Sequence, residues 1–225
     1  MQADGTVTEL ILLDGLPAAR ILCPPKMMPA PGKYLLAHAG GSDSPLAAPV
    51  FSTKSVADSF IAAPPVPDSW TPGAHLHLRG PLGHGFALPA SARHVALIAF
   101  DDSSRRLLAL LDAAFKQDAS VTLVCEDAPD DLPLQVEVQP LRTLSEVCAW
   151  ADYIALDTAR ESLPELRKKL GLSSPLKVWY EAQVLVRAPM PCGALAECGV
   201  CTVETRDGHS LACYDGPVFD LKEIF

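Results

Sequence analysis

The sequence has no run of apolar residues approaching the roughly 20 that a membrane-spanning helix needs. Its first residues include acidic side chains and lack the basic segment and small-residue cleavage site of a secretory signal. Basic residues are also scarce, because 18 Lys and Arg stand against 27 Asp and Glu, for a net charge of −9. Nucleic acid demands patches of Lys and Arg. We therefore expect a cytoplasmic protein that binds neither nucleic acid nor a membrane.

The sequence also lacks a recognisable hydrolytic constellation, since no nucleophile–base arrangement or pair of activated carboxylates stands out. Its seven cysteines are not arranged as an obvious disulfide framework, which suits a reducing compartment. Cys23, Cys125 and Cys148 are scattered in apolar surroundings, where a thiol behaves as a small buried hydrophobe. We therefore expect the functional site at the remaining four cysteines.

Those four cysteines are Cys192, Cys198, Cys201 and Cys213, with the spacing C-x5-C-x2-C-x11-C. Glycines beside the first two let the backbone approach closely and take positive φ, so that N–H groups can point toward sulfur. Four converging thiolates would repel one another without a bound cation. The segment therefore predicts a metal centre.

The spacing favours an iron–sulfur cluster over a zinc ion. Structural zinc sites usually pair their cysteines as two knuckles on separate hairpins. Here three cysteines share one loop and the fourth returns from the far side of an expected hairpin, close to the plant-type [2Fe–2S] pattern C-x4-C-x2-C…C. The extra residue is expected as a bulge near residues 194–197. Structural zinc, disulfides and inert thiols remain alternatives; a Rieske centre is disfavoured, because only His209 is near.

The first 90 residues show short β segments separated by Pro- and Gly-containing turns, which is typical of a small antiparallel barrel. The predicted strands are Thr6–Leu13, Ala18–Cys23, Lys33–Ala37, Pro49–Ser52, Ser59–Ala62 and Ala74–Leu78.

From residue 91 the pattern changes to alternating strands and helices, which predicts a doubly wound parallel sheet. The predicted strands are His94–Phe100, Ser120–Cys125, Tyr153–Leu156 and Leu176–Trp179, and the predicted helices are Ser103–Gln117, Ser145–Trp150 and Ser162–Leu170. We thus expect a mixed α/β chain of three units: a barrel over 1–90, an α/β unit over 91–182 and a small [2Fe–2S] loop domain over 183–225.

Three segments together resemble a known family: the cysteine loop, the turn GPLGHGF at residues 80–86 and the tail CYDGPVF at residues 213–219. The chain is similar to the electron-transfer subunit of the heteromeric, NAD-linked bacterial dihydroorotate dehydrogenase, a branch of the ferredoxin reductase superfamily. That subunit holds FAD between barrel and α/β layer, and one [2Fe–2S] cluster that relays electrons between FMN in the catalytic partner and the FAD.

The resemblance implies that Cys192, Cys198, Cys201 and Cys213 ligate the cluster and that the chain works in a hetero-oligomer. It also implies a set of FAD contacts. These are Pro49, Ser52, Gly80, Pro81, Gly83 and Gly85.

Two departures from the family argue against nucleotides on this chain. At the family's Arg-Pro-x-Ser-like flavin motif the sequence reads AAPVFS over residues 47–52 and has no arginine for the phosphates. After the first α/β strand, where relatives have a glycine-rich turn, it has Asp101 and Asp102, which repel a pyrophosphate and suit a helix N-cap. We expect no NAD(P)H binding, and FAD stays open.

The expected function is that of an electron-transfer subunit which exchanges electrons with a partner flavoenzyme, the FMN-containing dihydroorotate dehydrogenase of pyrimidine biosynthesis being the first choice. Related subunits serve other flavoenzymes and hydrogenases, so such a complex is the alternative. A non-redox scaffold protein in which the cysteines hold zinc is the alternative from another class.

Overall fold

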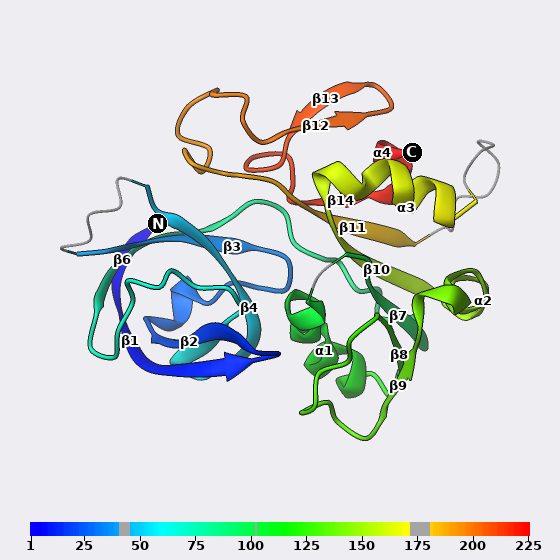
Figure 1. The fold of residues 1–225 in the computed structure, drawn as a ribbon, viewed down its shortest axis with the longest axis horizontal. Helices are drawn as coiled ribbons and strands as arrows, with labels where there is room; N and C mark the ends of the chain where they lie inside the picture. Colours follow the sequence, from blue (N-terminus) through cyan, green and yellow to red (C-terminus); the bar gives the residue numbers. More distant parts are fainter. Residues whose placement is uncertain (41–45, 102, 172–180) are drawn as a thin grey trace.

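The computed structural model describes residues 1–40, 46–101, 103–171 and 181–225. A β-barrel lies beside an α/β layer, and a small hairpin with its preceding loop lies above both (Figure 1). The mixed α/β fold predicted from the sequence is therefore confirmed.

Six antiparallel strands close the barrel in the order β1-β2-β5-β4-β3-β6. Alternate residues point inward, so that Val7, Leu35 and Leu76 have no exposed surface. All six predicted strands are present. Their bounds are β1 Gln2–Leu13, β2 Leu16–Leu22, β3 Tyr34–Ala39, β4 Ala48–Val56, β5 Ser59–Ala62 and β6 His75–Leu82, with a short 3₁₀ turn, η1, at Pro25–Met27.

The second sheet has six strands in the order β14-β11-β10-β7-β8-β9. All neighbours are parallel except β14, which runs antiparallel to β11. Strands covered on both faces need continuous apolar sequence, as in His94–Ala99. The bounds are β7 His94–Ala99, β8 Ser120–Val124, β9 Val136–Gln139, β10 Tyr153–Ala159, β11 Ala182–Arg187 and β14 Val218–Asp220.

Sequence patterns did not predict β9, β11 or β14, and the predicted strand at 176–179 lies outside the described residues. Because β11 and β14 both belong to the main sheet, the segment after residue 182 shares that sheet with the α/β unit. The predicted unit boundaries at residues 90 and 182 remain predictions.

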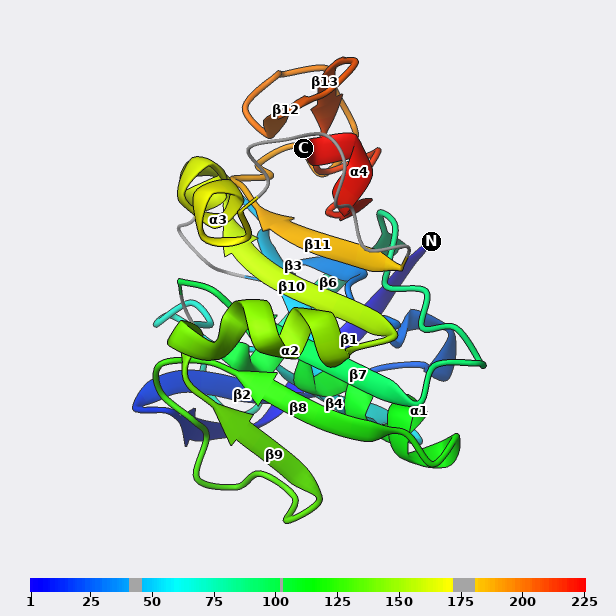
Figure 2. The same ribbon diagram turned by 90° about the vertical axis from the view of Figure 1, so that its right-hand side faces the viewer.

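Helices cover both faces of this sheet, as doubly wound topology requires. The first crossover lies between the barrel and the sheet (Figure 1), whereas α2 and α3 lie on the other face (Figure 2). No helix in the described ranges is long and apolar enough to cross a membrane. The helical bounds are η2 Ser104–Arg106, η3 Leu108–Leu110, α1 Leu111–Lys116, η4 Leu141–Thr143, α2 Leu144–Trp150, η5 Arg160–Ser162, α3 Leu163–Lys169 and α4 Leu221–Ile224.

The helix predicted over 103–117 is instead two 3₁₀ turns followed by the short helix α1. The Ser103 hydroxyl caps the first turn by accepting the N–H of Arg105 at 3.3 Å. Asp101 was predicted to cap this helix, but its carboxylate accepts from Ala159 N at 2.8 Å and from the Thr158 hydroxyl at 3.1 Å. Asp102 lies outside the described residues.

The hairpin predicted between the third and fourth cysteines is present as β12 (Thr202–Thr205) and β13 (Gly208–Leu211). The tail that follows forms β14 and α4, and the side chains of Val218, Phe219 and Leu221 are buried within this chain.

Candidate iron–sulfur site

The four predicted cysteine ligands lie in two pairs. The sulfur atoms of Cys192 and Cys198 are 3.5 Å apart, and those of Cys201 and Cys213 are 3.2 Å apart. Cys192 and Cys198 stand on the loop before β12, Cys201 immediately precedes β12, and Cys213 follows β13. The β12–β13 hairpin thus places Cys213 beside Cys201.

Pairing of this kind suits a centre with two metal ions better than one with a single ion. Two thiolates on one tetrahedral metal, each about 2.3 Å from it, are roughly 3.8 Å apart. Both observed pairs are close to that separation. Across the described residues no group of three or more ligating side chains is gathered around one point, as a zinc ion with four ligands would require. A [2Fe–2S] cluster needs two thiolates on each iron.

The two pairs differ in burial. Cys201 and Cys213 each expose only 1% of their surface, whereas Cys192 is half-buried and Cys198 is exposed. Backbone hydrogen bonding, that of Ala196 first, lowers the pKa of the Cys192 thiol to about 7, while burial raises the pKa of the Cys213 thiol to about 12. A cation that binds the Cys213 sulfur must therefore displace its proton, and the outer pair faces solvent.

The barrel holds the cysteine loop from one side. Gly193 has φ +50°, and an added Cβ would lie 2.1 Å from Leu36 Cδ1 of β3. The Arg79 guanidinium of β6 donates to the carbonyls of Cys192, at 3.3 Å, and Gly193. The buried Tyr34 hydroxyl donates to the carbonyl of Cys213 at 2.9 Å. The loop is thereby packed directly on strands β3 and β6.

The α/β layer holds the same loop from the other side. The Arg160 guanidinium at the end of β10 donates to the carbonyls of Val200 at 2.7 Å and Thr202 at 3.0 Å. Gly199, with φ +71°, makes the turn before them. Sequence patterns had not predicted either arginine, because each is far in sequence from the loop that it binds.

The predicted FAD contacts lie on β4, on β6 and in the turn after β6. The Ser52 side chain is buried and its hydroxyl lies 3.0 Å from that of Ser55, and Pro49 pairs with Leu36 of β3. Gly80 and Pro81 lie in β6. A Cβ on Gly83 would lie 2.4 Å from the Gly216 carbonyl oxygen.

A Cβ on Gly85 would likewise lie 2.5 Å from the carbonyl oxygen of Pro31. The chain's own backbone therefore accounts for the two glycines of this turn. The flavin-like motif has no arginine for the phosphates, and the assignment of these residues as FAD contacts remains a prediction.

The crevice at the carboxyl ends of β7 and β10, where the strand order reverses, is occupied by an ion-pair network. The buried Asp157 carboxylate accepts from Arg106 Nε at 2.6 Å and from Arg187 Nε at 2.7 Å. Arg187 also pairs with Asp101. Open α/β sheets bind dinucleotides at this position, on a glycine-rich turn. The carboxylates and arginines here do not fit a pyrophosphate.

Comparison with known proteins gives a family match for the cysteine segment. The family described as the iron–sulfur cluster binding domain of dihydroorotate dehydrogenase B matches residues 188–225. The match includes all four cysteines, β12, β13 and β14, so the chain has an iron–sulfur cofactor site of the kind found in an electron-transfer subunit. No curated protein matched the chain by sequence.

Solved structures show a similar fold over most of the chain. An NADH-dependent reduced ferredoxin-NADP oxidoreductase is similar with a TM-score of 0.74 and 14% identity, over 99% of this chain and 90% of that one. The ferredoxin reductase in carbazole 1,9a-dioxygenase gives 0.61 and 17%, over 81% and 68%. Phthalate dioxygenase reductase gives 0.58 and 10%, over 94% and 77%. At these identities the likeness establishes the ferredoxin-reductase-like fold.

Proposed function

We propose that this chain is an electron-transfer subunit whose cysteines 192, 198, 201 and 213 hold a [2Fe–2S] cluster. Its partner is a flavoenzyme, the FMN-containing catalytic subunit of dihydroorotate dehydrogenase in cytoplasmic pyrimidine biosynthesis. The observation that carries the proposal is the two pairs of thiols inside the segment that matches the cluster-binding family. The bound cluster would supply a one-electron step, and the protein would set its potential and its docking.

The outer pair of cysteines gives an electron its route to a partner. Cys198 is exposed, and the surrounding loop and turn present Leu195, Val200 and Tyr214 with 74%, 45% and 69% of their surface exposed. Large exposed apolar side chains beside the cysteines would be buried by a docked partner, which favours docking there. The inner pair lies over the buried Tyr34 hydroxyl, so docking at the outer edge brings a partner nearest to the cluster.

This chain does not supply the dinucleotide chemistry of a complete reductase. The crevice residues Asp157, Arg106 and Arg187 satisfy one another, and the flavin-like motif lacks a phosphate-binding arginine. We infer that the subunit exchanges electrons only with other proteins. Whether it also retains FAD through different contacts is decided by flavin analysis of the purified complex.

The proposal is tested by mixing the anaerobic, cluster-loaded chain with the FMN-containing catalytic subunit and adding dihydroorotate. Loss of the visible cluster absorption, at a rate that rises with partner concentration, is the expected result. Cys198→Ser should abolish the change, whereas Cys148→Ser, which alters a buried thiol outside the quartet, should not. A cluster that dithionite reduces but that this partner does not would favour a different flavoenzyme or a hydrogenase.

A further inference from the structure

Arg79 of β6 is a cation held beneath the cysteine loop. Alternation along the strand places its side chain on the outer face of the barrel with those of His75 and His77, which are exposed. Arg79 is half-buried instead, because its guanidinium donates to the carbonyls of Cys192, at 3.3 Å, and Gly193. Its positive charge is therefore fixed beside the backbone of a predicted cluster ligand.

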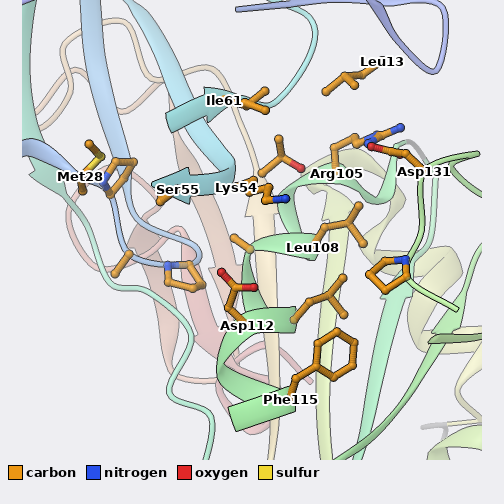
Figure 3. Close-up of a pocket in the computed structure, with 17 residues that line it drawn as sticks. Leu13, Met28, Lys54, Ser55, Ile61, Arg105, Leu108, Asp112, Phe115 and Asp131 are labelled. Carbon is orange, nitrogen blue, oxygen red and sulfur yellow. The ribbon is translucent and has the colours of Figure 1, made fainter. Parts of the chain in front are cut away.

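No carboxylate is bound to this cation within the described residues, where its side chain donates only to the two loop carbonyls. Other arginines with little exposed surface are balanced. The buried Arg105 binds the Asp131 carboxylate at 2.7 Å (Figure 3). Arg160, which holds the same loop from the α/β layer, pairs with Glu161 at 3.0 Å. Arg79 thus leaves a positive charge at the loop that no bound carboxylate cancels.

From this arrangement we propose that Arg79 raises the reduction potential of the cysteine site, an inference that rests on the proposed [2Fe–2S] cluster. A cluster on four thiolates carries negative charge and reduction adds to it, so a fixed cation nearby stabilises the reduced form. At an effective dielectric constant of about 20, a unit charge acting over about 10 Å shifts such an equilibrium roughly tenfold. Arg79 therefore favours the acceptance of an electron from a reduced flavin in the partner.

Gln2→Glu tests this inference without altering the loop. Gln2 is exposed and lies directly opposite Arg79 on the neighbouring strand β1, so that both side chains project from the same face. A glutamate there should bind the guanidinium and cancel much of its field, while both carbonyl contacts stay. We expect the ratio of reduced to oxidised cluster, measured by visible absorption at a fixed ambient potential and low salt, to fall about fivefold. Gln2→Ser is the matched control and should leave the ratio unchanged.

Arg79→Gln removes the charge itself. It should lower the same ratio about tenfold, which is roughly 59 mV for a one-electron couple. Arg79→Lys keeps the charge and should hold the ratio within about twofold of the unaltered chain. Iron and sulfide analysis, with circular dichroism, reports whether each variant has its cluster and its fold.

An unchanged ratio in cluster-loaded Arg79→Gln would overturn the inference. An equal fall in Arg79→Lys and Arg79→Gln would also overturn it, because the contact and not the charge would then be responsible. Should Arg79→Gln lose its cluster, an unchanged ratio in Gln2→Glu overturns the inference instead. An unaltered chain without iron and sulfide would contradict the proposed function, so the two failures are distinguishable.

Discussion

Replacing Gly193 by alanine tests whether the cysteine loop is packed on the barrel. The new Cβ would lie 2.1 Å from Leu36 Cδ1, 2.8 Å from Leu36 Cγ and 2.7 Å from Arg79 Nη2. Leu36 is buried, and Arg79 is bound to the loop carbonyls, so both must move. Gly199→Ala is the matched control, because φ is +71° there but the nearest atom beyond its chain neighbours, Thr202 Oγ1, is 3.8 Å away.

Both variants incur the cost of a left-handed conformation at a residue with a side chain, about 1–2 kcal/mol. Their difference isolates the steric contact, which at a packed site costs about 1–3 kcal/mol. We therefore expect Gly193→Ala to lower the free energy of unfolding by that additional amount and to lower iron content, relative to Gly199→Ala. Urea denaturation followed by circular dichroism, with iron analysis of each protein, measures both. Equal losses in the two variants would show that the loop does not rest on β3 and β6.

Three further predictions concern the ligands and the ion pairs. Cys198→Ser should lose the cluster and its visible absorption, while Cys148→Ser keeps them; full iron content in Cys198→Ser would refute the ligand assignment. Asp157→Asn leaves two arginines without their buried carboxylate and should lower the unfolding free energy by about 3–5 kcal/mol in a urea titration, and a loss under 1 kcal/mol would contradict the network. The hydrogen bond from Arg105 lowers the pKa of Asp14. The stabilisation that this ion pair gives is therefore present above the usual carboxyl pKa and should disappear as pH falls through the lowered value. Asp14→Asn should flatten that part of the stability–pH profile, and an unchanged slope would refute the pairing.

Local patterns predicted the elements that depend on their own residues. The strand Ser59–Ala62 was predicted with the observed bounds, and the helix predicted over Ser162–Leu170 is present as α3, Leu163–Lys169, shortly before Gly171 with φ +68°. Alternating or continuous apolar residues predict such elements, because the apolar residues that form the buried face are visible in the element's own sequence. The spacing of the four cysteines indicated that they share one site, and their sulfur atoms lie in two pairs; the [2Fe–2S] cluster on them stays a prediction.

Features that depend on distant partners were missed. The strand Val218–Asp220 is short and follows a Gly-Pro pair, and only its pairing with β11 makes it a strand. The first turns after β7 depart from a regular helix where Arg105 and Arg106 reach carboxylates 91 and 51 residues away in sequence. Apolar periodicity does not predict such contacts. The ion pairs that fill the crevice at the carboxyl ends of β7 and β10 could therefore be anticipated only from the acidic residues after β7.

Metal analysis of the anaerobically purified protein, together with its optical and electron paramagnetic resonance spectra, tests the central claim most directly. We predict two iron atoms and two acid-labile sulfide ions per chain, a brown protein, and a rhombic signal after reduction. A colourless protein with one zinc ion and no sulfide would contradict the account.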